Sequence, residues 1–76
     1  MIVNIQDKGN KIICIEGKFS KEDEGKFLVI PKIHFYTKVL FFQSPNIFEI
    51  ETFPSVSVRN IEALIVDNKS EVDLWI

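Results

Sequence analysis

Apolar and polar residues alternate with a period of two along much of this chain. Residues 1–6 (MIVNIQ) and 11–16 (KIICIE) both show the alternation, and a turn-rich tetrad at residues 7–10 (DKGN) separates them. Successive side chains of a β-strand point to opposite faces, so this period predicts strands with one buried face. The glycine in the tetrad allows the positive φ that tight turns require, which predicts a hairpin. We expect a register that places Ile5 opposite Ile12.

The stretch over residues 26–53 continues the pattern and holds seven of the nine aromatic side chains. Pro31 divides it into two strands, because proline cannot donate to a sheet ladder. Residues 44–46 (SPN) supply a turn before the last strand of this stretch. The expected pairing places Lys38 beside Glu51, so that opposite charges lie on neighbouring strands. The apolar face of this hairpin is expected to comprise Val39, Phe41, Phe48 and Ile50.

The C-terminal part of the chain allows two interpretations. Residues 60–76 can form a third hairpin around a turn at residues 67–70, with a wholly apolar face. The alternative is one short helix near residues 58–66, because Ile61 and Leu64 fall at helical spacing. We favour the hairpin.

Composition supports a β fold. Twelve Ile, seven Val and seven Phe stand against one Ala and four Leu. β-Branched and aromatic side chains fit a pleated surface and lose rotamer freedom in a helix. The sequence predicts a single all-β domain over residues 1–76, with at most one short helix. Consecutive hairpins would build a small antiparallel barrel or a strongly curled sheet of six to seven short strands. Charged residues and two glycines interrupt the pattern over residues 17–26, which predicts a loop anchored by Phe19.

Charge and cysteine content narrow the class of protein. The formal net charge is −2, so the chain lacks the broad positive field that supplies non-specific affinity for nucleic acids. A lone cysteine excludes an intrachain disulfide, and one cysteine with one histidine cannot form a structural zinc site. The longest apolar runs are four residues, far shorter than a membrane span, and the first residues lack the basic start of a signal peptide. We expect a cytoplasmic protein with no membrane association, no metal and no cofactor.

The sequence does not point to an enzyme. A nucleophile requires a general base within hydrogen-bond reach, and Cys14 and His34 lie on separate expected hairpins. Glu49 and Glu51 share a strand face, where pairing with Lys38 explains them without acid–base chemistry. Gly-rich phosphate loops and hydrolase motifs are absent from the sequence. No catalytic residue is therefore expected.

One strand face combines cations with an aromatic residue. The residues that share it are Lys32, His34, Tyr36 and Lys38, each two positions from the next. This combination suits a protein interface anchored by tyrosine, and it also suits base stacking with phosphate contacts on a β-sheet platform. A solvated strand face shows the same pattern. Trp75 either seals a second core layer or contacts another chain. The predicted partner-binding residues are Lys32, His34, Tyr36, Lys38, Glu49, Glu51 and Trp75.

These observations favour a non-catalytic domain that binds another protein. Its size and lack of catalytic residues are typical of an inhibitor, an immunity-type protein or a phage- or mobile-element-encoded antagonist that covers a surface of its partner. Two alternatives stay open. One is a small nucleic-acid-binding barrel that uses the Lys32, His34, Tyr36 and Lys38 face, and the other is a structural domain that self-associates as a homo-oligomer.

Overall fold

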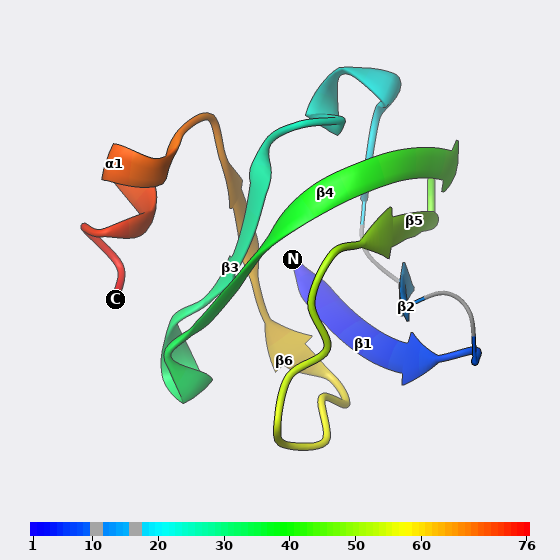
Figure 1. The fold of residues 1–76 in the computed structure, drawn as a ribbon, viewed down its shortest axis with the longest axis horizontal. Coiled ribbons are helices and arrows are strands. Elements are labelled where there is room, and N and C mark those ends of the chain that lie inside the picture. Colours follow the sequence, from blue (N-terminus) through cyan, green and yellow to red (C-terminus); the bar gives the residue numbers. More distant parts are fainter. Residues whose placement is uncertain (10–11, 16–17) are drawn as a thin grey trace.

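The computed structural model describes residues 1–9, 12–15 and 18–76, which form a mostly β structure (Figure 1). Its strands are β1 (Ile2–Asp7), β2 (Ile12–Ile15), β3 (Phe27–Ile30), β4 (Phe35–Ser44), β5 (Ile47–Ile50), β6 (Ile61–Glu62) and β7 (Leu64–Val66). The helices are the 3-10 helices η1 (Lys21–Asp23) and η2 (Pro31–Ile33) and the α-helix α1 (Lys69–Val72). The strands follow the order β6-β1-β2-β5-β4-β3-β7, with antiparallel pairing throughout the described ladders. The predicted all-β, antiparallel character is confirmed.

The two strands at the ends of this order are neighbours in the chain. β6 pairs with β1, and β7 pairs with β3, although only Ala63 separates β6 from β7. One short segment therefore reaches both ends of the sheet, so the sheet curls around an enclosed core (Figure 1). No ladder joins β6 to β7 in the described part of the chain. The closed barrel, one of the two predicted forms, is thus not found.

The first hairpin has a different register from the predicted one. Ile5 lies opposite Cys14 rather than opposite Ile12. The shift is two residues, which is also the side-chain period of a strand, so Val3 and Ile5 of β1 keep their predicted buried face. Gly9 has a φ of 86°, the left-handed conformation that glycine tolerates best. The predicted turn at residues 7–10 lies partly outside the described residues.

A β-bulge changes the predicted faces of the central hairpin. Val39 lies opposite Ile50. Phe41, two residues later, lies opposite Glu49, so Leu40 is an additional residue in β4. One additional residue reverses the alternation beyond it, which leaves Phe41 60% exposed. The prediction that Phe41 belongs to the core is therefore wrong, whereas the other three residues of that predicted face are buried.

The segment before β3 supports the bulge. The Glu24 carboxylate accepts the backbone N–H of Phe42, just beyond the bulge, at 2.8 Å. This hydrogen bond is the main reason why the pKa of Glu24 lies below its usual value. Gly25, with a φ of 86°, donates its N–H to the carbonyl of Val39 at 2.9 Å. The charged segment that was predicted as a loop is therefore fixed to β4 by hydrogen bonds.

The main core lies inside the curl of the sheet. Its buried residues are Val3, Ile5, Phe19, Leu28, Ile30, Val39, Phe48, Ile50, Val58 and Ala63. Phe19 comes from the segment before η1 and packs edge-to-face on Phe48, with ring planes at 84°. It is 8% exposed, so it anchors its segment as the sequence predicted.

A second, smaller core lies on the outer face of the sheet. Val29 is fully buried, although its neighbours Leu28 and Ile30 already point into the main core. α1 covers the outer face at this point, where Val72 packs with Val29 and Val66. β3 is therefore buried on both faces, since successive side chains of a strand alternate.

The C-terminal part of the chain matches neither predicted interpretation. Residues 60–76 do not form a hairpin, because β6 and β7 pair with β1 and β3. The α-helix is also not near residues 58–66 but at Lys69–Val72. Asn68 begins it as the N-cap, since its side-chain oxygen accepts the N–H of Glu71 at 3.1 Å. Asparagine favours turns and helix caps alike, which explains why the sequence pattern suggested a hairpin turn here.

Candidate functional site

Four of the predicted partner-binding residues surround one hollow beside β4. The hollow measures about 360 Å³ and is lined by Phe27, His34, Phe35, Tyr36, Thr37, Lys38, Glu51 and Thr52. We call the set His34, Tyr36, Lys38 and Glu51 the Tyr36 surface. It combines an aromatic ring with side chains of both charges.

β4 and the segment after β5 bring this surface together. Tyr36 and Lys38 are two residues apart in β4 and therefore share a face. Glu51 lies beside Lys38, as predicted, because its N–H donates to the Lys38 carbonyl at 3.0 Å. The next residue, Thr52, donates its N–H to the buried hydroxyl oxygen of Thr37 at 2.9 Å. These two bonds fix the segment that carries Glu51 against β4.

η2 determines the positions of two further predicted residues. Pro31 ends β3 and opens η2, as its lack of an N–H favours. Lys32 lies in this helix and His34 caps it, so neither belongs to the strand that the sequence predicted for them. His34 has a φ of 51° and donates its N–H to the Pro31 carbonyl at 3.1 Å. This left-handed turn leads directly into β4 and leaves His34 exposed at the rim of the hollow.

The Tyr36 ring is held by two neighbours and still faces solvent. The ring centroids of Phe27 and Tyr36 are 6.2 Å apart, and the Lys69 Nζ lies 4.8 Å from the Tyr36 centroid. A hydrogen bond from Lys69 to Asp73, at 2.9 Å, is the main cause that raises the pKa of Lys69, and Tyr36 adds to the shift. Tyr36 is nevertheless 40% exposed. The ring is therefore ordered and accessible.

The other three predicted residues lie outside the Tyr36 surface. A second hollow, of about 450 Å³, is lined by Met1, Pro31, Lys32, Glu62, Ala63, Leu64 and Trp75. Trp75 is 51% exposed and does not seal the second core, which Val72 closes instead. Glu49 is half-buried opposite Phe41 and lines neither hollow. The predicted set thus divides into two surfaces and one separate glutamate.

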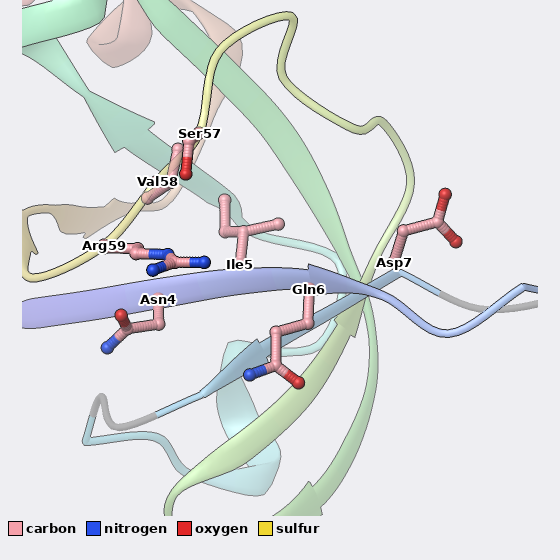
Figure 2. Close-up of a pocket in the computed structure, with 7 residues that line it drawn as sticks. All are labelled: Asn4, Ile5, Gln6, Asp7, Ser57, Val58 and Arg59. Carbon is pink, nitrogen blue, oxygen red and sulfur yellow. The ribbon is translucent and has the colours of Figure 1, made fainter.

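A third hollow, which sequence reasoning missed, lies between β1 and residues 57–59 (Figure 2). It measures about 400 Å³ and is lined by Asn4, Ile5, Gln6, Asp7, Ser57, Val58 and Arg59. The Val58 carbonyl accepts the N–H of Ile5 at 3.1 Å, which holds the segment against β1. Figure 2 shows Arg59 extending along β1 beside Ile5, whereas Asp7 lies at the end of the strand. With one charge of each sign at separate places, this hollow has no concentrated charge that would select an ion.

The Tyr36 surface also includes contributors that the sequence did not indicate. Phe27 faces Tyr36 because β3 pairs with β4, and Lys69 reaches the ring because α1 folds back over the sheet. Among the described residues, no cluster of three or more His, Cys, Asp or Glu is placed to hold a metal ion. The side chain of Cys14 lies outside the described part of the structure. None of the helices in the described ranges is long and apolar enough to cross a membrane.

Comparison with protein-family models, with curated proteins and with solved structures gives no significant match. A fold alone does not define a function, so function has to follow from the chemistry of the surfaces. Of the three hollows described above, the one at Tyr36 combines an ordered aromatic ring with charged side chains at its rim.

Proposed function

We propose that this domain binds another protein through the Tyr36 surface, without catalysis. The observation that carries the proposal is the Tyr36 ring, which Phe27 and Lys69 hold in place while 40% of the residue stays exposed. An ordered side chain loses little conformational entropy when it is buried by a partner. Tyrosine is also one of the residue types that dominate binding energy at protein interfaces.

The charges around Tyr36 suit a protein better than a nucleic acid. Lys38 and Glu51 line the same hollow, so a partner with charges of both signs can match it. A further cation beside the Tyr36 ring, Lys69, is already paired with Asp73 at 2.9 Å. A phosphate backbone would meet an unfavourable carboxylate at Glu51 and a partly neutralised cation at Lys69.

The rigidity of the surface favours a role in covering a partner. Tyr36 and Lys38 project from a strand whose intervening residue, Thr37, is 2% exposed and hydrogen-bonded. Binding groups on buried strands are held more accurately than groups on loops. This arrangement suits an inhibitor, an immunity-type protein or an antagonist that occludes a surface of its target. The single cysteine fits a reducing compartment, so we place this action in the cytoplasm.

Affinity capture from the native host tests the proposal with three matched baits. They are the unmodified chain, Tyr36→Ala and Phe41→Ala, the last of which removes an aromatic ring that is 60% exposed at the bulge. We expect the unmodified chain and Phe41→Ala to recover the same protein. We expect Tyr36→Ala to bind the purified partner about 30-fold more weakly, because a hot-spot residue contributes about 2 kcal/mol or more.

Two outcomes would contradict this proposal. Equal recovery by all three baits would show that Tyr36 is not the anchor. A labelled oligonucleotide that binds at about 50 mM salt, is released at about 200 mM and is lost in Tyr36→Ala would make a nucleic acid the ligand instead. Far-UV circular dichroism of both variants establishes that they remain folded.

A further inference from the structure

The hollow that contains Lys32 and Trp75 has an apolar floor and a charged rim. Met1, Pro31, Ala63 and Leu64 provide the apolar part, and Trp75 forms one wall. Lys32 and Glu62 line the same hollow and carry opposite charges. Both are exposed to solvent, with the Glu62 side chain 71% exposed. We call this feature the Trp75 hollow.

An apolar group projects from the residue next to Trp75. After α1 the chain continues as a helical turn, in which Leu74 donates its N–H to Glu71 at 3.1 Å and Trp75 donates to Val72 at 2.9 Å. The turn presents three successive apolar residues, Leu74, Trp75 and Ile76, which are 82%, 51% and 43% exposed. A run of exposed apolar residues in an ordered turn marks a contact surface, because water is a poor environment for it.

The groups of this surface can be matched by those of an identical copy. In a twofold pair the same patch faces itself, so each group must find its match on an identical copy. Leu74 is the projecting apolar group, and the Trp75 hollow is the apolar depression that can receive it. Glu62 pairs with the amino group of Met1 within the chain, but its side chain is still 71% exposed. A twofold rotation can therefore place Lys32 of each copy opposite Glu62 of the other.

We infer that two copies of this chain associate through the Trp75 hollow in a twofold arrangement. Leu74 of each copy inserts into the hollow of the other, and Lys32 of each copy lies opposite Glu62 of the second copy. This interface is separate from the Tyr36 surface, so it does not depend on the proposed function. Tyr36→Ala is accordingly expected to remain dimeric.

Sedimentation velocity from about 1 µM to about 1 mM tests this inference on the full chain. The unmodified chain is expected to rise from a mass of 8.8 kDa towards twice that value. Leu74→Asp is expected to stay monomeric, because the charge would be buried in the hollow of the second copy. Phe41→Asp is the matched control, since it places the same charge at another exposed apolar position and should leave the dimer unchanged.

A charge exchange tests the twofold geometry itself. Lys32→Glu and Glu62→Lys are each expected to weaken the dimer at least about tenfold, because both place like charges opposite each other. A mixture of the two variants restores both ion pairs and should associate as the unmodified chain does. Comparing the two variants also controls for the ion pair between Glu62 and the amino group of Met1, because only Glu62→Lys removes that pair. A monomer at the highest concentration, a dimer that Leu74→Asp leaves intact, or a mixture no stronger than either variant would overturn the inference.

Discussion

Replacing Phe19 with alanine should destabilise the whole domain, although Phe19 lies in an irregular segment. Its ring is 8% exposed and packs edge-to-face on Phe48 in the main core. Its backbone N–H donates to the Pro45 carbonyl at 2.9 Å, which holds the ring at that place. Removing a buried phenylalanine ring costs about 3–5 kcal/mol, from lost burial and from the cavity that is left. We expect about 3 kcal/mol, since the irregular segment can move partly into the space.

This loss is large for a chain of 76 residues. At about 0.05–0.15 kcal/mol per residue, the free energy of unfolding is roughly 4–11 kcal/mol. A reduction of about 3 kcal/mol leaves a folded protein with a Tm roughly 12–24 °C lower, at about 4–8 °C per kcal/mol.

Urea unfolding followed by far-UV circular dichroism measures the effect. Linear extrapolation gives the free energy of unfolding, and an unchanged slope would show that both states expose the same surface. Phe53→Ala is the matched control, because it removes the same ring from another irregular segment where the residue is 45% exposed. It should cost less than about 1 kcal/mol. Equal losses in the two variants, or a loss below about 1 kcal/mol for Phe19→Ala, would refute the reasoning from burial.

Two further substitutions test the supports of the sheet. Glu24 accepts the N–H of Phe42, and its pKa in the folded protein is lowered from 4.5. Its contribution to the free energy of unfolding is therefore fully present above pH 4.5 and is lost as the pH falls through the lower pKa of the folded state. The Tm of the unmodified protein should therefore fall on acidification more steeply than that of Glu24→Gln, and parallel curves would contradict this role. Val72→Ala should cost about 1.5 kcal/mol, at about 0.8 kcal/mol for each buried methyl group, and should shift the fluorescence of Trp75 to the red. Val56→Ala, at a residue 49% exposed, should change neither quantity.

The sequence predicts the fold class because its local pattern and its residue types agree. Period-two alternation and the excess of β-branched residues both indicate strands, and strands are what the chain forms. The error at Phe41 has a specific cause. Leu40, the additional residue of the bulge, is an ordinary strand residue by type. The bulge is supported by Glu24, which lies in another segment of the chain and accepts the N–H of Phe42. A β-bulge of this kind leaves no signal in the alternation itself.

The residues of the candidate site also differ in whether a local hairpin or long-range packing places them. Tyr36, Lys38 and Glu51 come together through one hairpin, so period and register are enough to predict them. Lys69 reaches Tyr36 only because α1 packs across the outer face of β3. That packing depends on Val72, a β-branched residue whose type favours a strand, so the sequence does not indicate the helix that carries it. Sequence reasoning therefore finds the strand residues of the surface and misses the residue that holds the ring.

The position of α1 links the two proposed interfaces. Docking of Val72 against Val29 brings Lys69 over Tyr36 and also fixes the turn that presents Leu74 beside the Trp75 hollow. Val72→Ala should therefore weaken both capture of the partner and self-association, because it loosens the element that carries a part of each surface. Tyr36→Ala and Leu74→Asp should each affect only one of the two. If Val72→Ala lowered stability but left both interactions at full strength, α1 would be a cover for the outer core and nothing more.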